Sequence, residues 1–168
     1  QPSARGELEI TEAIQWLIDH SRTVRAEMVS GWWKDTGRPS DLLDANRVLL
    51  SELRPSTDGE IDEHSTVEGS VRIAAGAKVT RSELRGPVVI GPDTVIEDSV
   101  VGPNVSIERD GRVLRSRLRD SILMEGCQIV DVGELADSIL GRNVEVQHSG
   151  SDGVHRLVVG DQSRVELD

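Results

Sequence analysis

The chain has 168 residues, a formal net charge of −11 and one cysteine, Cys127. The acidity excludes a general binder of nucleic acid or of anionic membranes, because both classes depend on clustered Lys and Arg. No apolar run approaches the roughly 20 residues of a spanning helix, and the single cysteine excludes an internal disulfide and is compatible with a cytoplasmic location.

The first third of the chain predicts two helices with a strand between them. Thr11 is a candidate N-cap for a helix that ends near His20 and Ser21. Residues 24–30 alternate loosely between apolar and polar, which indicates a strand. A second helix with a one-sided apolar stripe is predicted to begin at Ser40. It stops at Pro55, because proline ends a helix. The start of the chain has neither an initiator Met nor an apolar signal region, so we expect it to begin inside a longer protein.

The stretch from Gly31 to Pro39 joins the predicted strand to the second helix. It contains two adjacent tryptophans and then Asp35, directly before a Gly-containing turn. A carboxylate at a strand end that leads into a loop is well placed for chemistry. It is also a common turn residue, and both interpretations of Asp35 stay open on the pattern alone.

From Ile61 onward the apolar residues recur mostly every six positions, with occasional steps of five and one step of ten, from Val113 to Leu123. The series is Ile61, Val67, Ile73, Val79, Leu84, Ile90, Ile96, Val101, Ile107, Val113, Leu123, Ile129, Leu135, Leu140 and Val146. One coil therefore takes 17 or 18 residues in three short strands, which predicts a parallel β-helix of about five coils to Val146. Residues 147–156 depart from the period and predict an excursion loop, followed by a last partial coil.

These patterns divide the chain into three parts: residues 1–54, a linker over 55–60 and a β-helix over 61–168. All aromatic residues except histidine lie in the first part, and Phe and Tyr are absent. A core of small aliphatic residues suits the thin, repetitive packing of a β-helix.

Two segments resemble the second half of the sugar-1-phosphate nucleotidylyltransferases. They are residues 5–14 (RGELEITEAI) and residues 31–37 (GWWKDTG), in that order. The resemblance covers the whole chain and is to the long-form glucose-1-phosphate thymidylyltransferases in particular, which carry a C-terminal hexapeptide β-helix. It implies an α+β part of a nucleotidyltransferase domain followed by a left-handed β-helix. It also implies an enzyme that transfers a nucleotidyl group from dTTP to glucose 1-phosphate, giving dTDP-glucose and pyrophosphate.

The resemblance also implies roles for single residues. Asp35 matches a ligand of Mg²⁺, which the chemistry needs where phosphate charge concentrates. Trp33 and Thr11 match positions near the sugar. On a strand, Glu7 and Glu9 would share a face with Thr11, so one of them is expected to accept hydrogen bonds from sugar hydroxyls, while a solvated, salt-bridging glutamate stays an alternative for either. By the same alternation Trp32 is expected in the core, and Trp16 is expected to pack on its helix.

The family's glycine-rich nucleotide loop, its catalytic arginine, its phosphate-contacting lysine and its first metal-binding carboxylate have no counterpart in this sequence. We therefore expect the chain alone to lack turnover. Its β-helix is expected to join copies of the chain into a homo-oligomer, with a trimer favoured.

Two further interpretations concern the β-helix. Hexapeptide β-helices also occur as trimeric acyltransferases with a histidine base, for which His148 and His155 are candidates, while His64 lies in the first coil. A cluster of arginines could line a groove for an anionic effector or form a charge-balanced, solvated face. Its members are Arg109, Arg112, Arg115, Arg117 and Arg119.

Overall fold

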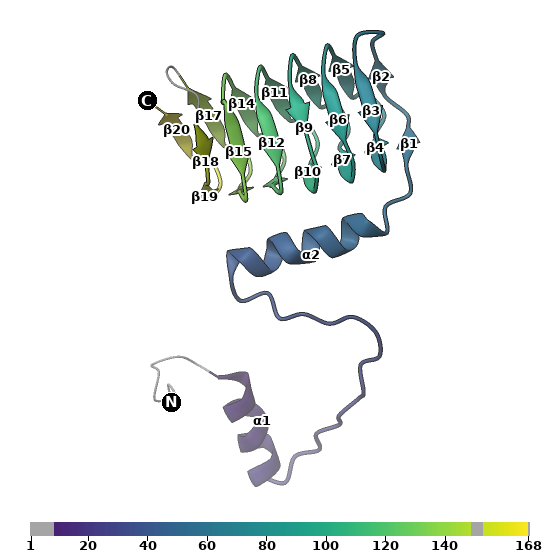
Figure 1. The fold of residues 1–168 in the computed structure, drawn as a ribbon. Helices are drawn as coiled ribbons and strands as arrows, with labels where there is room; N and C mark the ends of the chain where they lie inside the picture. Colours follow the sequence, from purple (N-terminus) through teal and green to yellow (C-terminus); the bar gives the residue numbers. More distant parts are fainter. Residues whose placement is uncertain (1–8, 149–152, 168) are drawn as a thin grey trace. The chain divides into compact units, whose positions relative to one another are not determined.

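The structure is a computed structural model that describes residues 9–148 and 153–167. The chain forms two compact units, residues 1–33 and residues 34–168. Figure 1 shows the elements in chain order. No helix among the described residues is long and apolar enough to cross a membrane.

The described part of the first unit contains one helix, α1 (Ile10–Asp19). Its N-cap is Glu9, whose carbonyl accepts the Glu12 and Ala13 N–H groups, so the prediction that Thr11 caps the helix was wrong by two residues. The C-cap is His20, as predicted. The predicted strand over residues 24–30 is also wrong, since the segment has no regular secondary structure. A strand is stabilised by a ladder partner, and the described residues offer it none.

The second unit begins with a loop and α2 (Pro39–Ser51). Pro39 occupies the first helical turn, where its missing N–H costs nothing. The carboxylate of Asp41 accepts the Arg38 N–H at 2.9 Å and so satisfies the start of the helix. The helix ends at a C-cap on Glu52, three residues before Pro55, which confirms the predicted second helix.

The rest of the second unit is a β-helix built from three parallel sheets (Figure 1). Sheet A contains β1 (Ser56–Thr57), β4 (Val71–Ile73), β7 (Val88–Ile90), β10 (Val105–Ile107), β13 (Ile122–Leu123), β16 (Ile139–Leu140) and β19 (Val158–Val159). Sheet B contains β2 (Glu60–Ile61), β5 (Lys78–Thr80), β8 (Val95–Glu97), β11 (Arg112–Leu114), β14 (Gln128–Val130), β17 (Glu145–His148) and β20 (Arg164–Leu167). Sheet C contains β3 (Thr66–Glu68), β6 (Glu83–Arg85), β9 (Val100–Val101), β12 (Arg117–Arg119), β15 (Glu134–Ala136) and β18 (Val154–His155).

The six-residue repeat of the sequence is confirmed by the strand register. Ile61, Val79, Ile96, Val113, Ile129 and Val146 are partners along sheet B, one above the other. Such aliphatic columns form the hydrophobic core. Strand pairing already begins at Ser56, which lies within the segment expected to be a linker and pairs with Arg72. The division of the chain at 54 and 61 stays a prediction.

The predicted excursion loop over residues 147–156 is shorter than expected. His148 belongs to β17 and pairs with Leu167, and His155 belongs to β18 and pairs with Leu135. Residues 153–156 therefore already contribute to the next coil. The extra length is visible in sheet B, where Val146 and Val165 are partners 19 residues apart, against 17 for Val79 and Ile96.

The corners of the coils combine a left-handed residue with a buried serine. Asp98 and Arg115 have positive φ angles of 49° and 48°, and each precedes a serine. The buried Ser99 hydroxyl donates to the Glu97 carbonyl at 2.7 Å and accepts the Ser116 N–H at 3.1 Å. Ser82 and Ser116 repeat this arrangement in the neighbouring coils. The serines thus satisfy backbone groups that the corner removes from the sheets.

We expect Ser99→Ala to lower the free energy of unfolding by about 1–3 kcal/mol, because the buried Ser116 N–H would lose its acceptor. Urea denaturation followed by circular dichroism measures this difference. The exposed Ser56→Ala is the control. A loss no larger for Ser99→Ala than for Ser56→Ala would show that the serine corner contributes nothing to stability.

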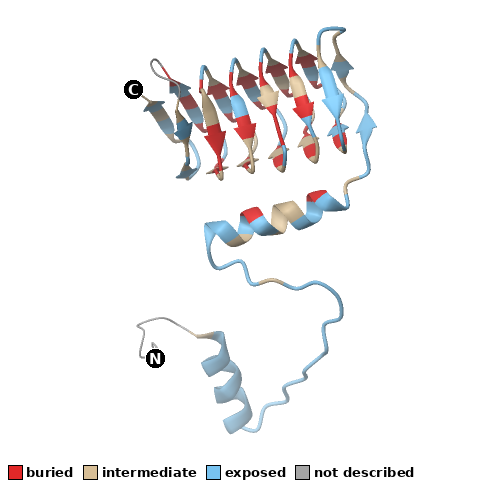
Figure 2. Cartoon of the chain, in the orientation of Figure 1, coloured by how far each residue is buried: buried red, intermediate tan, exposed pale blue. Residues whose placement is uncertain are grey.

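Helix α2 covers the outer face of sheet A. Ser106, in the middle of β10, donates its hydroxyl to the Asn46 amide oxygen at 2.6 Å, and the Asn46 NH₂ group donates to the Asn104 carbonyl at 3.3 Å. Leu43 and Leu50, three and four residues from Asn46, are buried on the same side of the helix (Figure 2). Burial of two leucines stabilises this docking by about 1.5–3 kcal/mol each.

The face of sheet A under α2 is unusually apolar for an outer surface. Its outward column contains Val89, Ser106, Ile122, Ile139 and Val158. The first four are partly buried, whereas Val158 near the last coil is 52% exposed. The helix therefore belongs to the same unit as the β-helix and covers one of its faces.

Candidate substrate and metal site

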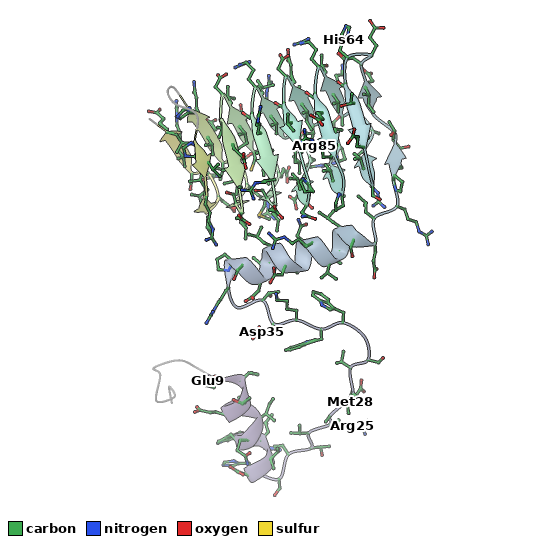
Figure 3. All side chains as sticks on the ribbon, viewed as in Figure 1. Glu9, Arg25, Met28, Asp35, His64 and Arg85 are labelled. Carbon is green, nitrogen blue, oxygen red and sulfur yellow. The ribbon has the colours of Figure 1, made fainter. Side chains whose placement is uncertain are left out.

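Asp35 lies in the loop that leads into α2, and its side chain is exposed (Figure 3). Its neighbour Lys34 donates to the Asp44 carboxylate at 2.6 Å and lies 3.6 Å from that of Asp41. The hydrogen bond from Lys34 lowers the pKa of Asp44, and the pKa of Lys34 is raised in return. The loop is thus held on one side of Asp35 while the Asp35 carboxylate faces solvent.

A carboxylate oxygen is the donor type that Mg²⁺ prefers, and Mg²⁺ in phosphate-binding sites is commonly held by one or two carboxylates together with substrate phosphates. Asp35 fits one such position. Among residues 9–148 and 153–167 no group of three or more His, Cys, Asp or Glu side chains is placed to hold a metal. The remaining ligands would have to come from substrate phosphates and from a carboxylate outside the described residues.

The expected sugar-side residues lie in the first unit. Thr11 is exposed within α1, and Trp33 is 72% exposed. Glu9 is partly buried at the N-cap of α1 (Figure 3), and Glu7 lies outside the described residues. Because the helix begins at Ile10, the argument that Glu9 and Thr11 share the face of a strand was wrong. Their roles toward a sugar stay predictions.

Large apolar side chains of the first unit are exposed to an unusual degree. Trp32, expected in the core, is 56% exposed, and Met28 is 96% exposed. Trp16 is 55% exposed and stacks on His20 of the next turn, with ring centroids 4.0 Å apart. Ile10, Ile18, Val24 and Val29 are also exposed. So many exposed large apolar side chains on a folded protein normally mark an interaction surface.

The histidines and the cysteine of the β-helix lie in different surroundings. His148 is only 6% exposed, and its ring lies 5.5 Å from that of His155. Neither ring therefore lies on an open loop. His64 is exposed in the first coil, 3.6 Å from Glu63. Cys127 is buried in the core, and burial raises the pKa of its thiol to about 11, so it is not a reactive nucleophile.

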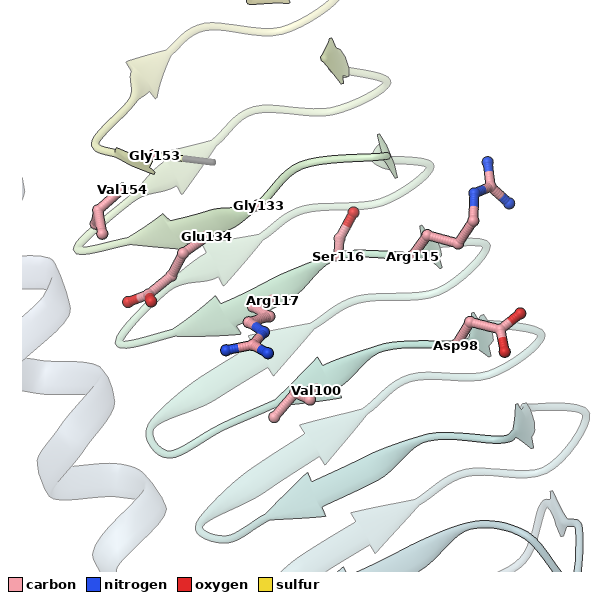
Figure 4. Close-up of a pocket in the computed structure, with 9 residues that line it drawn as sticks. All are labelled: Asp98, Val100, Arg115, Ser116, Arg117, Gly133, Glu134, Gly153 and Val154. Atoms are coloured by element: carbon pink, nitrogen blue, oxygen red, sulfur yellow. The ribbon is translucent and has the colours of Figure 1, made fainter. Parts of the chain in front are cut away.

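Two of the five arginines of the cluster on the β-helix form ion pairs with neighbouring carboxylates. Arg115 pairs with Asp131 of the next coil, and Arg119 pairs with Glu134 at 2.6 Å. Arg117 lies on the outer face of sheet C and lines a shallow hollow of about 580 Å³ (Figure 4). Asp98, Val100, Glu134 and Val154 also line this hollow. Acidic and basic groups alternate there, which favours the charge-balanced face over an anion-binding groove.

The matches to known proteins include residues of both units. The nucleotidyl transferase family matches residues 1–52. A glucose-1-phosphate thymidylyltransferase of Streptomyces antibioticus is 42% identical over 168 residues, which cover 99% of this chain and 47% of the relative. The chain is homologous to glucose-1-phosphate thymidylyltransferases along its whole length. A second such protein, from Streptomyces griseus, is 44% identical with the same coverage.

This thymidylyltransferase homology confirms the expected resemblance, and the described fold confirms the parallel β-helix. A protein named bifunctional protein GlmU, from Methanococcus vannielii, is 36% identical over 83% of this chain and 34% of the relative. The chain spans about half the length of the thymidylyltransferases that it matches.

Sequence reasoning missed a group of charged residues that connect α2 to the β-helix. Arg47 of α2 donates to Asp120 at 2.9 Å and to Asp137 at 3.1 Å. These two aspartates begin Asp-Ser pairs 17 residues apart, one coil length. That recurrence, together with a cation among the apolar residues of the second helix, is the signal that could have revealed the contact.

Proposed function

We propose that this chain is the C-terminal portion of an enzyme that transfers a nucleotidyl group from dTTP to glucose 1-phosphate, giving dTDP-glucose and releasing pyrophosphate. The observation that carries the proposal is homology to glucose-1-phosphate thymidylyltransferases over 99% of the chain, through both the first unit and the β-helix. The match of residues 1–52 to the nucleotidyl transferase family supports the assignment of the first unit to the catalytic domain.

The exposed apolar surface of the first unit supports the same proposal. Trp16, Met28 and Trp32 remain exposed among the described residues. The relatives are about twice as long as this chain. We infer that the other half of the nucleotidyl transferase domain covers this surface and supplies the nucleotide-binding loop, the catalytic arginine and the first carboxylate.

The reaction requires a phosphate oxygen of the sugar phosphate to bond to the α-phosphorus of dTTP, while the bond from that phosphorus to the leaving pyrophosphate breaks. In this proposal Asp35 would be one ligand of a Mg²⁺ ion, which would offset the negative charge that concentrates on the phosphates. Glu7 or Glu9, with Thr11 and Trp33, would bind and orient the sugar. Orientation of the two reactants in this way is a large part of catalysis in such transfers.

The chain alone is expected to release no pyrophosphate from dTTP and glucose 1-phosphate with Mg²⁺. Addition of a separately expressed N-terminal half should restore release, because each half lacks part of the site. A coupled phosphate assay after pyrophosphatase treatment measures the rate. Turnover by the chain alone would overturn the assignment of the missing groups to the other half.

Limited trypsin digestion gives a structural control for the same mixing experiment. Arg22 and Arg25 lie in the exposed segment after α1 and should be cleaved rapidly in the chain alone. The N-terminal half should slow this cleavage and leave cleavage at Arg164, near the last coil, unchanged. Equal cleavage rates at all sites with and without the other half would contradict the proposed covering of the first unit.

The β-helix is proposed to assemble the enzyme into a homo-oligomer, with a trimer favoured. The faces of sheets B and C lie outside the cover of α2 and carry charged residues in register, such as Glu145 beside Arg164 in sheet B and Glu68 beside Arg85 in sheet C. Analytical ultracentrifugation of the chain measures its mass directly. A monomer at micromolar concentration would remove this part of the proposal.

A second candidate, acyl transfer by the β-helix, is raised by the relatives named bifunctional. His148, its candidate base, is buried against His155. The test is acyl-CoA binding by the chain and by His148→Ala. Binding that needs His148 would favour acyl transfer, and no binding, or binding that survives His148→Ala, would count against it.

A further inference from the structure

The loop that carries Asp35 is tied to α2 on both sides of that residue. On one side, Lys34 donates to the Asp44 carboxylate at 2.6 Å. On the other, the Arg38 N–H donates to the Asp41 carboxylate at 2.9 Å. The position of the Asp35 backbone is therefore set by the first two turns of α2.

Arg47 connects those turns to the β-helix. Its guanidinium group donates to Asp44 at 3.1 Å within the helix, to Asp120 at 2.9 Å and to Asp137 at 3.1 Å. Asp120 and Asp137 lie in neighbouring coils, at the corners before β13 and β16. One planar cation thus meets three carboxylates, one of which is the acceptor for Lys34.

The two kinds of contact under α2 have different consequences. The buried leucines Leu43 and Leu50 hold the helix against sheet A, but apolar packing is not directional. Partly exposed ion pairs contribute little to stability, whereas a guanidinium group has a fixed fork of donors that specifies direction. The hydrogen bond to Asp120 is also the main cause of the raised pKa of Arg47. Loss of Arg47 should therefore leave the helix docked but less well oriented.

We propose that Arg47 is a positioning residue: it fixes α2 on the β-helix through Asp120 and Asp137, and through Asp44 and Lys34 it holds the loop that carries Asp35. This inference rests on the proposed role of Asp35 in nucleotidyl transfer. It gives the β-helix a part in catalysis in addition to assembly, because two of its coils become the base on which a metal-binding loop is held.

The test compares Arg47→Gln with wild type in the full-length protein. We expect kcat to fall about tenfold, because a small displacement of a reacting or metal-binding group has an effect of this order or larger. The thermal midpoint should change little. Amide hydrogen exchange in residues 36–44 should become faster, a readout that does not depend on activity. Arg115→Gln removes a comparable pair with Asp131 within the β-helix and is the matched control. It should leave kcat and the hydrogen exchange of residues 36–44 unchanged.

Two variants separate positioning by the β-helix from local effects on α2. The double variant Asp120→Asn with Asp137→Asn should reproduce the loss of kcat and the faster exchange. Arg47→Lys should restore only part of the activity, since an ammonium group lacks the guanidinium fork. If the double variant behaves like wild type while Arg47→Gln does not, the contact to the β-helix is not the source of the effect and the inference is wrong.

Asp35→Asn, measured beside these variants, distinguishes failure of the inference from failure of the proposed function. If Asp35→Asn abolishes activity while Arg47→Gln keeps wild-type kcat and exchange, the inference is wrong and the proposed function stands. If Asp35→Asn is fully active, the proposed metal role is wrong, and so is the link from Arg47 to catalysis. Faster exchange in Arg47→Gln would then support only the structural connection.

Discussion

Asp35→Ala in the full-length protein is expected to lower the rate of pyrophosphate release by about 100-fold or more at saturating Mg²⁺. The carboxylate lies exposed in the loop before α2 and makes no hydrogen bond or ion pair with the described residues, so its removal leaves the fold intact. The loss should therefore fall on the reaction itself. It should be present at every glucose 1-phosphate concentration, because the metal acts on the phosphates that react.

The matched control for this prediction is Asp58→Ala, which removes another exposed carboxylate of the same unit, at the first corner of the β-helix. It should leave the rate unchanged. Initial rates over a range of Mg²⁺ concentrations would separate weakened metal binding from a general loss. Equal rates for wild type and Asp35→Ala would show that Asp35 is only a turn residue and that the metal is held elsewhere.

Leu118→Ala is expected to lower the free energy of unfolding of the chain by about 2–5 kcal/mol. Leu118 is 1% exposed and stands in the inward column of sheet C, where it pairs with Val101 below and Leu135 above. Truncation leaves a cavity between two coils, and a solenoid depends on the contacts between neighbouring coils. The loss of packing contacts should therefore affect the coils on both sides of Leu118.

Urea denaturation followed by circular dichroism measures this loss. Leu49→Ala is the control, because Leu49 is 70% exposed on α2 and its truncation should change the free energy by no more than about 0.5 kcal/mol. A loss of that small size for Leu118→Ala would contradict the assigned register of sheet C.

Leu118 also illustrates how far the repeat could be followed in the sequence. Most inward positions are six residues apart, and the columns through Ile61 and Ile73 could be predicted from that spacing. Leu118 lies five residues after Val113 and five before Leu123, so it breaks the period twice. The reason is a coil of 16 residues, since Val113 pairs with Ile129. A shortened corner is a property of the backbone turn and leaves no apolar signal.

The first unit shows where local patterns were insufficient. The alternation around Glu9 and Thr11 predicted a strand face, but α1 starts at Ile10. Trp32 was expected in the core and is exposed. Both predictions rested on the alternation of a strand, but Thr11 lies in a helix and residues 24–30 form no strand.

The contacts of Arg47 were beyond the reach of the sequence for a different reason. The apolar stripe after Ser40 correctly predicted the second helix and its end before Pro55. However, the partners of Arg47 are 73 and 90 residues away. Only the stacking of the coils brings Asp120 and Asp137 to the same side of the β-helix as α2.

The most direct test of the central claim is identification of the product made by the full-length protein. Incubation with dTTP, glucose 1-phosphate and Mg²⁺, followed by mass spectrometry, should show dTDP-glucose in a one-to-one ratio with pyrophosphate. If no nucleoside diphosphate sugar forms from dTTP or UTP with glucose 1-phosphate, the assignment of this chain to a nucleotidylyltransferase that acts on glucose 1-phosphate is contradicted.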